Sequence, residues 1–309
     1  MPPLIAICGP TAVGKSSLAL QLAEEYDGEI VSADSGQVYR FCDIGTAKPT
    51  AEERLRVPHH LIDILNPDQL FSVGLFVEKA REVIADIEKR GKIIFLVGGT
   101  GLYLRALFEG LSSLPSRQVL REELELIASS GRLSDLYDEL KQVDPKTAGR
   151  IKPGDRQRIV RALEVFRATG HPLSSLQGRR SSLFSQPLLK IGLSLERTSL
   201  YNRINERVKT MFERGWVQET EKLIDRWGDA IAPLKLIGYR EIATLLKGTV
   251  TLDETIRLVC QKTRNYAKRQ LTWFRTDPEI HWHEPSESSL FKSLIDTLLT
   301  SNASHATSV

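Results

Sequence analysis

Over the first hundred residues, short unbroken hydrophobic runs alternate with longer segments of helical periodicity. The apolar runs 4–7 and 93–97 predict buried strands, and residues 29–33 predict another. Between them, hydrophobic side chains recur at helical spacing over 72–90, and Gly91 follows as a typical helix end. Strands separated by helices predict an α/β fold with a parallel sheet flanked by helices.

The pattern changes in the middle of the chain. Residues 114–187 are mostly helical and basic, with Pro and Gly breaks, and 190–195 predict a strand that returns to the sheet. A helical excursion between two strands of one sheet predicts an inserted, mostly helical subdomain. From 199 to about 275 the chain again has helical character. We therefore expect an α/β core with C-terminal helices over 1–113 and 188–283, a helical basic insertion over 114–187, and a flexible tail over 284–309.

The loop after the first predicted strand matches the pattern G-x-x-x-x-G-K-[ST] and precedes a helix that starts near Ser17. In such a P-loop, backbone N–H groups and a helix N-terminus surround phosphate oxygens, Lys15 adds a full positive charge, and Ser16 can bind Mg²⁺. The alternative is a glycine turn that only joins strand to helix. The predicted phosphate-binding residues are Gly9, Pro10, Thr11, Ala12, Val13, Gly14, Lys15 and Ser16.

Two further strand ends carry polar loops, 34–37 and 98–101. Asp34 is a candidate Mg²⁺ ligand or general base, and its alternative role is to cap the next segment. A P-loop ATPase usually has an acid after its most apolar strand, whereas glycines follow 93–97 here, so an acid on the neighbouring strand stands out. Thr100 could place a hydroxyl beside a ligand or lie in a tight turn. Because ligands lie beyond the carboxyl ends of parallel strands, all three loops should meet at one crevice.

Other polar residues have two interpretations each. Lys48 could reach a pyrophosphate or be solvated. Arg203 and Arg207, four apart on a predicted helix, could grip a diphosphate or pair with neighbouring glutamates. The pair His59–His60 lacks further Cys or His residues at ligand spacing, so we do not expect zinc.

Composition narrows the class of protein. The 309 residues include three widely spaced cysteines, an odd number that favours free thiols in a reducing cytoplasm over a disulfide framework. No apolar run is long enough to span a membrane, and the first strand begins too early for a signal peptide. Nothing resembles a dimer seam, so we expect a cytoplasmic monomer without membrane contact.

The net charge is only +3, but basic residues are concentrated in two stretches. Residues 146–180 contain nine basic side chains against two acids, and residues 257–275 contain six with no acid and with interleaved aromatic rings. Such stretches are often solvated helix faces, but two of them in one chain favour contact with nucleic acid.

Seven motifs then occur in order along the chain, at 9–16, 34–39, 43–49, 58–63, 98–103, 157–164 and 267–275. Together they closely resemble the tRNA dimethylallyltransferase (isopentenyl-tRNA transferase) family of bacteria, from residue 4 to about 283. The resemblance implies transfer of a dimethylallyl group from dimethylallyl diphosphate to N6 of the adenosine 3′-adjacent to the anticodon of tRNA. The P-loop would then hold the diphosphate of the prenyl donor, with Mg²⁺.

The same resemblance implies roles for individual residues. Asp34 matches the general base, Thr11 and Thr100 match residues near the diphosphate and the reacting centre, and Arg207 matches a pyrophosphate-binding arginine. Arg121 matches a tRNA contact, although Arg117-Gln118 replaces the Ala-Asp-Pro that often precedes it. The tRNA contacts implied are Asp34, Ser35, Gly36, Gln37, Thr100, Arg121, Gln157, Arg158, Ile159, Val160, Arg161, Lys235, Leu236, Ile237, Gly238, Tyr239 and Arg240.

Two other function classes remain open at this point. A P-loop kinase or NTPase would explain 9–16 but would leave both basic stretches without a role. A non-enzymatic RNA-binding module would use the P-loop only as a switch. Transfer of labelled dimethylallyl to tRNA without ATP distinguishes the three.

Overall fold

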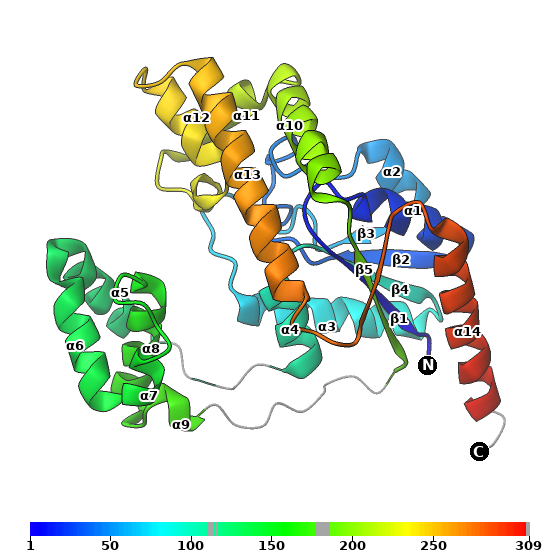
Figure 1. The fold of residues 1–309 in the computed structure, drawn as a ribbon, viewed down its shortest axis with the longest axis horizontal. Coiled ribbons are helices and arrows are strands. Elements are labelled where there is room, and N and C mark those ends of the chain that lie inside the picture. Colours follow the sequence, from blue (N-terminus) through cyan, green and yellow to red (C-terminus); the bar gives the residue numbers. More distant parts are fainter. Residues whose placement is uncertain (111–113, 115–116, 177–185, 307–309) are drawn as a thin grey trace. The chain divides into compact units, whose positions relative to one another are not determined.

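A computed structural model describes residues 1–110, 114, 117–176 and 186–306 (Figure 1). The chain folds as two compact units. The first combines Met1–Leu107 with Phe184–Val309, and the second is Phe108–Leu183, where the sequence predicted an insertion from 114 to 187.

The first unit is built on a parallel sheet with the strand order β3-β2-β4-β1-β5-β6. The α/β class predicted from the sequence is confirmed. Two strands were not predicted, β3 and β6, because each is short and rich in histidine rather than in aliphatic residues. The strands are β1 (Leu4–Cys8), β2 (Gly28–Ser32), β3 (His59–His60), β4 (Ile93–Val97), β5 (Leu188–Leu193) and β6 (Ile280–His283).

Helices flank this sheet, and α10 to α13 lie together beyond the carboxyl end of β1 (Figure 1). The 3₁₀ segment η2 (Ala232–Lys235) precedes α12. The helices of the first unit are α1 (Lys15–Glu25), α2 (Ala51–Arg56), α3 (Val73–Lys89), α4 (Gly101–Glu109, which runs to the boundary with the second unit), α10 (Arg197–Glu213), α11 (Trp216–Trp227), α12 (Tyr239–Leu246), α13 (Leu252–Phe274) and α14 (Ser288–Ala306).

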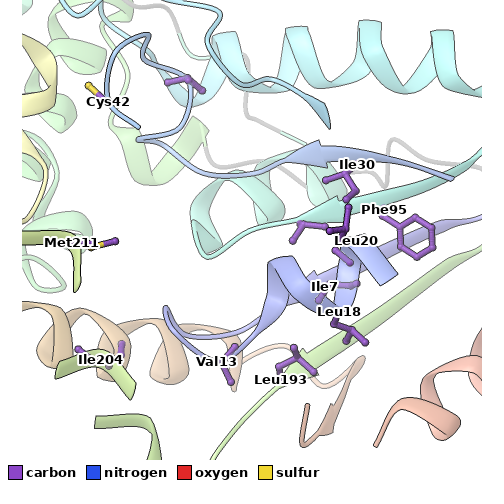
Figure 2. Close-up of a cluster of buried hydrophobic side chains, with 14 of the residues drawn as sticks. Ile7, Val13, Leu18, Leu20, Ile30, Cys42, Phe95, Leu193, Ile204 and Met211 are labelled. Atoms are coloured by element: carbon purple, nitrogen blue, oxygen red, sulfur yellow. The ribbon is translucent and has the colours of Figure 1, made fainter. Parts of the chain in front are cut away.

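The core lies between the sheet and its helices. Every residue of β1 is buried, as is nearly all of β4, which explains why these strands read as unbroken apolar runs. Figure 2 shows Ile7 and Phe95 of the sheet with Leu18 and Leu20 of α1 in the same hydrophobic cluster. Burial of these central strands fixes where their carboxyl ends, and hence the polar loops, are placed.

The C-terminal segment forms a packed helix rather than the flexible tail predicted for 284–309. In α14, Phe291 and Ile295 are fully buried in the main core. The hydroxyl of Tyr26 donates a 2.9 Å hydrogen bond to Asp296 Oδ1, and Lys292 pairs with Glu25 over 2.6 Å. The prediction was wrong for this helix because its apolar residues, four apart, find a tertiary partner in the first unit.

The second unit is helical throughout its described residues. Its core includes Leu124, Leu140 and Leu163. Asp144 is buried there and accepts hydrogen bonds from Thr147 N (3.0 Å), Thr147 Oγ1 (2.6 Å) and Ser174 N (2.9 Å), which joins α7 to the segment of α9. The helices are α5 (Gln118–Ile127), a π-helical turn (Ala128–Arg132), α6 (Leu133–Val143), α7 (Pro145–Ala148), α8 (Arg156–Thr169) and α9 (Leu173–Leu176).

Candidate active site

A cavity of about 390 Å³ lies within the first unit at the carboxyl ends of β1, β2 and β4. Its walls include Lys15 and Ser16 after β1, Asp34 after β2, and Gly98 and Gly99 after β4. The prediction that these strand ends meet at one crevice is therefore correct. Helices α10 and α13 and the segment η2 also contribute to its walls.

The loop between β1 and α1 has the backbone that phosphate binding requires. Gly9 has φ 135°, and a Cβ there would lie 2.5 Å from Leu193 O, so only glycine fits. Gly14 (φ 111°) caps α1 without a side-chain hydrogen bond, which leaves the N-terminus of this helix available to an anion. Within the loop, Val13 is fully buried in the core, whereas Thr11, Ala12, Lys15 and Ser16 face the cavity.

Lys15 and Arg207 give the cavity its positive charge. Lys15 Nζ donates hydrogen bonds to Gly9 O (3.0 Å) and Pro10 O (2.8 Å). Burial, together with the neighbouring Arg207, lowers the pKa of Lys15 to about 8, while Asp34 opposes both effects. Burial also lowers the pKa of Arg207, again opposed by Asp34. An anionic ligand would reduce the electrostatic repulsion between these two half-buried cations.

Positive charge also predominates among all the side chains that line the cavity. Among the described residues that line it, Lys15, Arg207, Lys235 and Arg269 face a single carboxylate, Asp34. Arg207 Nη1 lies 3.4 Å from Thr11 Oγ1, so α10 contributes directly to the phosphate loop. The arrangement favours a ligand with several negative charges, such as a diphosphate.

The two carboxylate oxygens of Asp34 have different surroundings. Its Oδ1 accepts hydrogen bonds from Gly36 N (2.8 Å) and Gln37 N (3.3 Å), which form the turn after β2. Within the described residues its Oδ2 accepts no hydrogen bond, although Asp34 lines the cavity. One oxygen therefore holds the turn, and the other is available to a substrate proton.

Gln37 connects this turn to the loop that follows. Its Oε1 accepts a hydrogen bond from Ser32 Oγ (2.9 Å), and its Nε2 donates to Thr46 O and Ala47 O (3.3 Å each). A Cβ on Gly36 would lie 2.9 Å from the Thr46 methyl group. The loop 43–49 is thus packed against the Asp34 turn and forms part of the cavity wall.

Comparison with known proteins shows the family to which this site belongs. Residues 37–277 match the model of the IPP transferase family, and residues 2–62 match that of isopentenyl transferase. The chain belongs to the IPP transferase family.

Its relatives are named for one activity. The tRNA dimethylallyltransferase 2 of Geotalea uraniireducens is 50% identical over 289 residues, which cover 92% of this chain and 93% of that protein. The tRNA dimethylallyltransferase of Geobacter metallireducens is 50% identical over 300 residues and 96% of each chain. The likeness extends over nearly the whole length of both proteins.

Solved structures of the family have the same fold as this chain. The full-length tRNA isopentenylpyrophosphate transferase of Bacillus halodurans is 40% identical, with a TM-score of 0.73 over 99% of each chain. A eukaryotic dimethylallyltransferase, described as acting on tRNA, is 30% identical, with a TM-score of 0.79 over 91% of this chain and 73% of that one. The chain is thus an IPP transferase in sequence and in fold.

Two positions considered as site residues from the sequence, Thr100 and Lys48, do not line the cavity. Thr100 follows Gly99 and precedes α4, and its side chain reaches the hydroxyl of Tyr266, which does line the cavity. Lys48 does not reach the cavity at all. Its ammonium group bonds to Tyr39 O (2.6 Å), Asp43 Oδ1 (2.8 Å) and Asp63 Oδ1 (2.5 Å), so both sequence interpretations of Lys48 were wrong.

Two residues that support the site were missed from the sequence. The carboxylate of Glu219 accepts hydrogen bonds from Asp43 N (2.8 Å), Ile44 N (2.7 Å), Gly45 N (3.1 Å) and the hydroxyl of Tyr239 (2.7 Å). Gln270 connects the P-loop to the turn after β4. Nothing in the local pattern separates Glu219 from other helical acids, whereas Gln270 lies in the motif 267–275 and could have been singled out there.

The residues predicted to contact tRNA fall into three groups. Lys235, Leu236 and Ile237 line the cavity, as do Asp34 to Gln37. Arg121, Gln157, Arg158 and Arg240 are exposed, and Arg161 is half-buried. By contrast, Gly238 is buried, and so are the side chains of Ile159, Val160 and Tyr239, which therefore cannot contact tRNA in this conformation. Ile159 and Val160 pack in the core of the second unit and Tyr239 in that of the first.

The fold also neutralises part of the basic stretch 146–180. Arg156 pairs with Glu125 (2.5 Å), and Arg167 pairs with Glu139 (2.8 Å) and Glu123 (3.3 Å). These acids lie outside the stretch in sequence and reach it only through packing of α5 and α6 against α8. Lys146, Arg150 and Lys152 are exposed and form no ion pair within the described residues, and Arg179 and Arg180 lie outside the part of the chain that is described.

The donors near the P-loop fit a hard cation that is shared with a phosphate ligand. The Ser16 hydroxyl and the Asp34 carboxylate both line the cavity. His59 and His60 bond instead to Val57 O (2.7 Å) and Glu29 Oε2 (2.6 Å). In the described part of the chain no three His, Cys, Asp or Glu residues are arranged to hold a metal ion, and no helix is long and apolar enough to cross a membrane.

Proposed function

We propose that the protein transfers a dimethylallyl group from dimethylallyl diphosphate to N6 of the adenosine 3′-adjacent to the anticodon of tRNA, releasing diphosphate. The observation that carries the proposal is a cavity lined by two half-buried cations, Lys15 of the P-loop and Arg207 of α10, and by Asp34 after β2, whose carboxylate has one oxygen without a hydrogen bond in the described residues. Membership of a family whose relatives are named tRNA dimethylallyltransferases supplies the substrates.

At the diphosphate end, the chain stabilises the leaving group. As the C1–O bond of the donor breaks, its electron pair moves to the diphosphate. Lys15, Arg207 and the N-terminus of α1 face the place where that charge grows, and all are fixed before the reaction begins. If Mg²⁺ is bound, the Ser16 hydroxyl and the diphosphate oxygens would hold it, and its charge would neutralise the leaving group further.

At the adenosine end, Asp34 acts as the general base. The N6 nitrogen forms the new bond to C1 of the dimethylallyl group and becomes positively charged. Its proton then passes to Asp34 Oδ2, while Oδ1 keeps the turn in place. An aromatic amine is a weak nucleophile, so removal of this proton as the bond forms lowers the barrier.

The tRNA must present its adenosine to this cavity. A base in the anticodon loop has to leave its stack to reach a buried donor. Lys235 lies at the cavity wall, and the exposed cations Arg257, Lys268 and Arg269 of α13 could bind the RNA backbone. We propose that the enzyme works in the cytoplasm, where its tRNA substrate is found, and its predicted monomeric state can be measured by light scattering.

The proposal is tested with labelled dimethylallyl diphosphate, unmodified tRNA and Mg²⁺ in the absence of ATP. We expect label to enter the tRNA, and to be absent from a control tRNA with guanosine in place of the target adenosine. ATP-dependent release of phosphate without label transfer would instead indicate a P-loop kinase or NTPase. Binding of tRNA with neither reaction would indicate an RNA-binding module.

A further inference from the structure

Helix α13 reaches into the base of the cavity through one buried amide. Gln270 is only 6% exposed. Its Oε1 accepts a hydrogen bond from Thr11 N (2.9 Å), and its Nε2 donates one to Gly99 O (2.9 Å). One side chain thus bridges the P-loop after β1 and the glycine turn after β4, which are separate in sequence from each other and from α13.

The glycines of the turn after β4 pack tightly against side chains of α13. A Cβ added to Gly99 would overlap Gln270 Nε2, and a Cβ added to Gly101 would overlap the ring of Trp273. Gln270 and Trp273 therefore pack α13 directly against the Gly98–Gly101 turn. Because a buried N–H or carbonyl group is unfavourable without a partner, the amide of Gln270 determines where both loops rest.

The Gln270 bridge is connected to other side chains that line the cavity. Thr11 N is committed to Gln270, and the Thr11 hydroxyl lies 3.4 Å from Arg207 Nη1. One turn earlier on α13, the Tyr266 hydroxyl contacts the side chains of Thr100 and Gln270. Burial raises the pKa of Tyr266 to about 12, so its hydroxyl stays protonated. Displacing Gln270 would disturb Thr11, Arg207 and Thr100 together.

We propose that Gln270 is a positioning residue for prenyl transfer, which holds the P-loop and the Gly98–Gly101 turn at the spacing that the departing diphosphate requires. The inference rests on the proposed transferase function. Gln270 also lines the cavity, but its amide oxygen and nitrogen are bonded to Thr11 N and Gly99 O, so it acts through these loops rather than on the substrate itself. Its loss should therefore lower kcat more than it raises KM for dimethylallyl diphosphate.

The first test compares Gln270→Met with Gln261→Met in the full-length enzyme. Met has nearly the length of Gln without its amide, and Gln261 is an exposed residue of the same helix. We expect Gln270→Met to lower kcat about ten- to a hundredfold with KM changed by less than about threefold, and Gln261→Met to resemble the wild type. If the wild type transfers label and Gln270→Met keeps its kcat, the inference is overturned. If the wild type transfers no label, the proposed function itself fails.

A second variant covers the possibility that Gln270→Met does not fold. Gln270→Glu keeps an acceptor for Thr11 N but donates to Gly99 O only when its carboxyl group is protonated. We therefore expect its kcat, divided by that of the wild type, to rise as the pH falls from about 8 to about 6. A ratio independent of pH would contradict the role of the Gly99 contact.

A third measurement tests whether Gln270 positions Arg207 or only stabilises the fold. If Gln270 acts through Arg207, the effects of Gln270→Met and Arg207→Met on kcat will not add in a double-mutant cycle. Additive effects would show that Gln270 only supports the fold.

Discussion

Lys48 donates a 2.5 Å hydrogen bond to Asp63, which lies 15 residues further along the chain. The side chain of Lys48 is 1% exposed, and its ammonium group also bonds to Tyr39 O and Asp43. Arg54 pairs with the second oxygen of Asp63 over 2.7 Å. Burial alone would raise the pKa of Asp63, but the hydrogen bonds from Lys48 and Arg54 lower it. Lys48 thereby fixes the loop 43–49, which forms part of the cavity wall.

We expect Lys48→Met to destabilise the protein by about 3 kcal/mol, because it leaves the Tyr39 carbonyl without its buried charged donor and leaves Asp63 paired with Arg54 alone. Equilibrium unfolding in urea measures this change. Lys209→Met is the matched control, since Lys209 pairs with Glu206 on the exposed surface of α10, where water screens the pair and its loss should change stability far less. Equal effects of the two variants would contradict the structural role of Lys48.

Asp34→Asn should separate the two roles of Asp34. The amide oxygen of Asn can still accept hydrogen bonds from Gly36 N and Gln37 N, so the turn should survive. An amide cannot take a proton from the adenosine, so we expect turnover to fall by about a hundredfold or more. Single-turnover transfer and tRNA binding are measured side by side. A variant with near-normal turnover would remove Asp34 from the mechanism.

Affinity for the diphosphate should depend on the charge of Lys15. Its pKa is about 8 in the free protein, so Lys15 is protonated below that pH and loses its charge above it. A diphosphate favours the protonated form. Binding of a non-reacting thiodiphosphate analogue should therefore weaken as the pH rises above 8, with uptake of a proton on binding near that pH. Calorimetry in buffers of different ionisation enthalpy detects the proton.

Lys15→Arg provides the control for that measurement, because a guanidinium group stays charged throughout the range. Its affinity for the analogue, whatever its absolute value, should vary little between pH 7.5 and about 9.5. The same pH dependence in wild type and variant would mean that another group titrates.

The exposed and the paired cations of the second unit should behave differently. Lys152 is exposed, so Lys152→Ala should weaken tRNA binding about two- to fivefold and lower the salt dependence of binding by about one unit of slope. Arg167 is paired with Glu139 and Glu123, so Arg167→Ala should cost about 1 kcal/mol of stability and leave that slope unchanged. Binding titrations at several salt concentrations, together with urea unfolding, separate the two cases.

Much of the fold was predictable because its signals are local. Strand β4 and the phosphate loop are specified by consecutive residues, namely an apolar run buried on both faces and a glycine pattern that permits positive φ at Gly9 and Gly14. The helix over 72–90 was predicted to within a residue at each end, since Ser72 caps it and Gly91 follows it. The approach of the three strand ends followed from the parallel sheet alone.

Side-chain partners were not predictable in the same way. The basic stretch 146–180 looked almost unopposed, yet acids on α5 and α6 reach it once the helices pack. Likewise, α14 looked like a flexible tail because its apolar residues have no partner until the core exists. In each case the charge or hydrophobicity was visible, but its partner lay in another element.

Residues close together in the chain specify the class of fold, the phosphate loop, the acid at the end of β2 and, through the motifs, the family. Which of these groups act together depends instead on how the helices pack on the sheet. Gln270 bonds to Thr11 across 259 residues, and Glu219 bonds to the loop that begins at Asp43 across 176. The physical reason is that a hydrogen bond depends on distance in space, which only the packing of the helices on the sheet establishes.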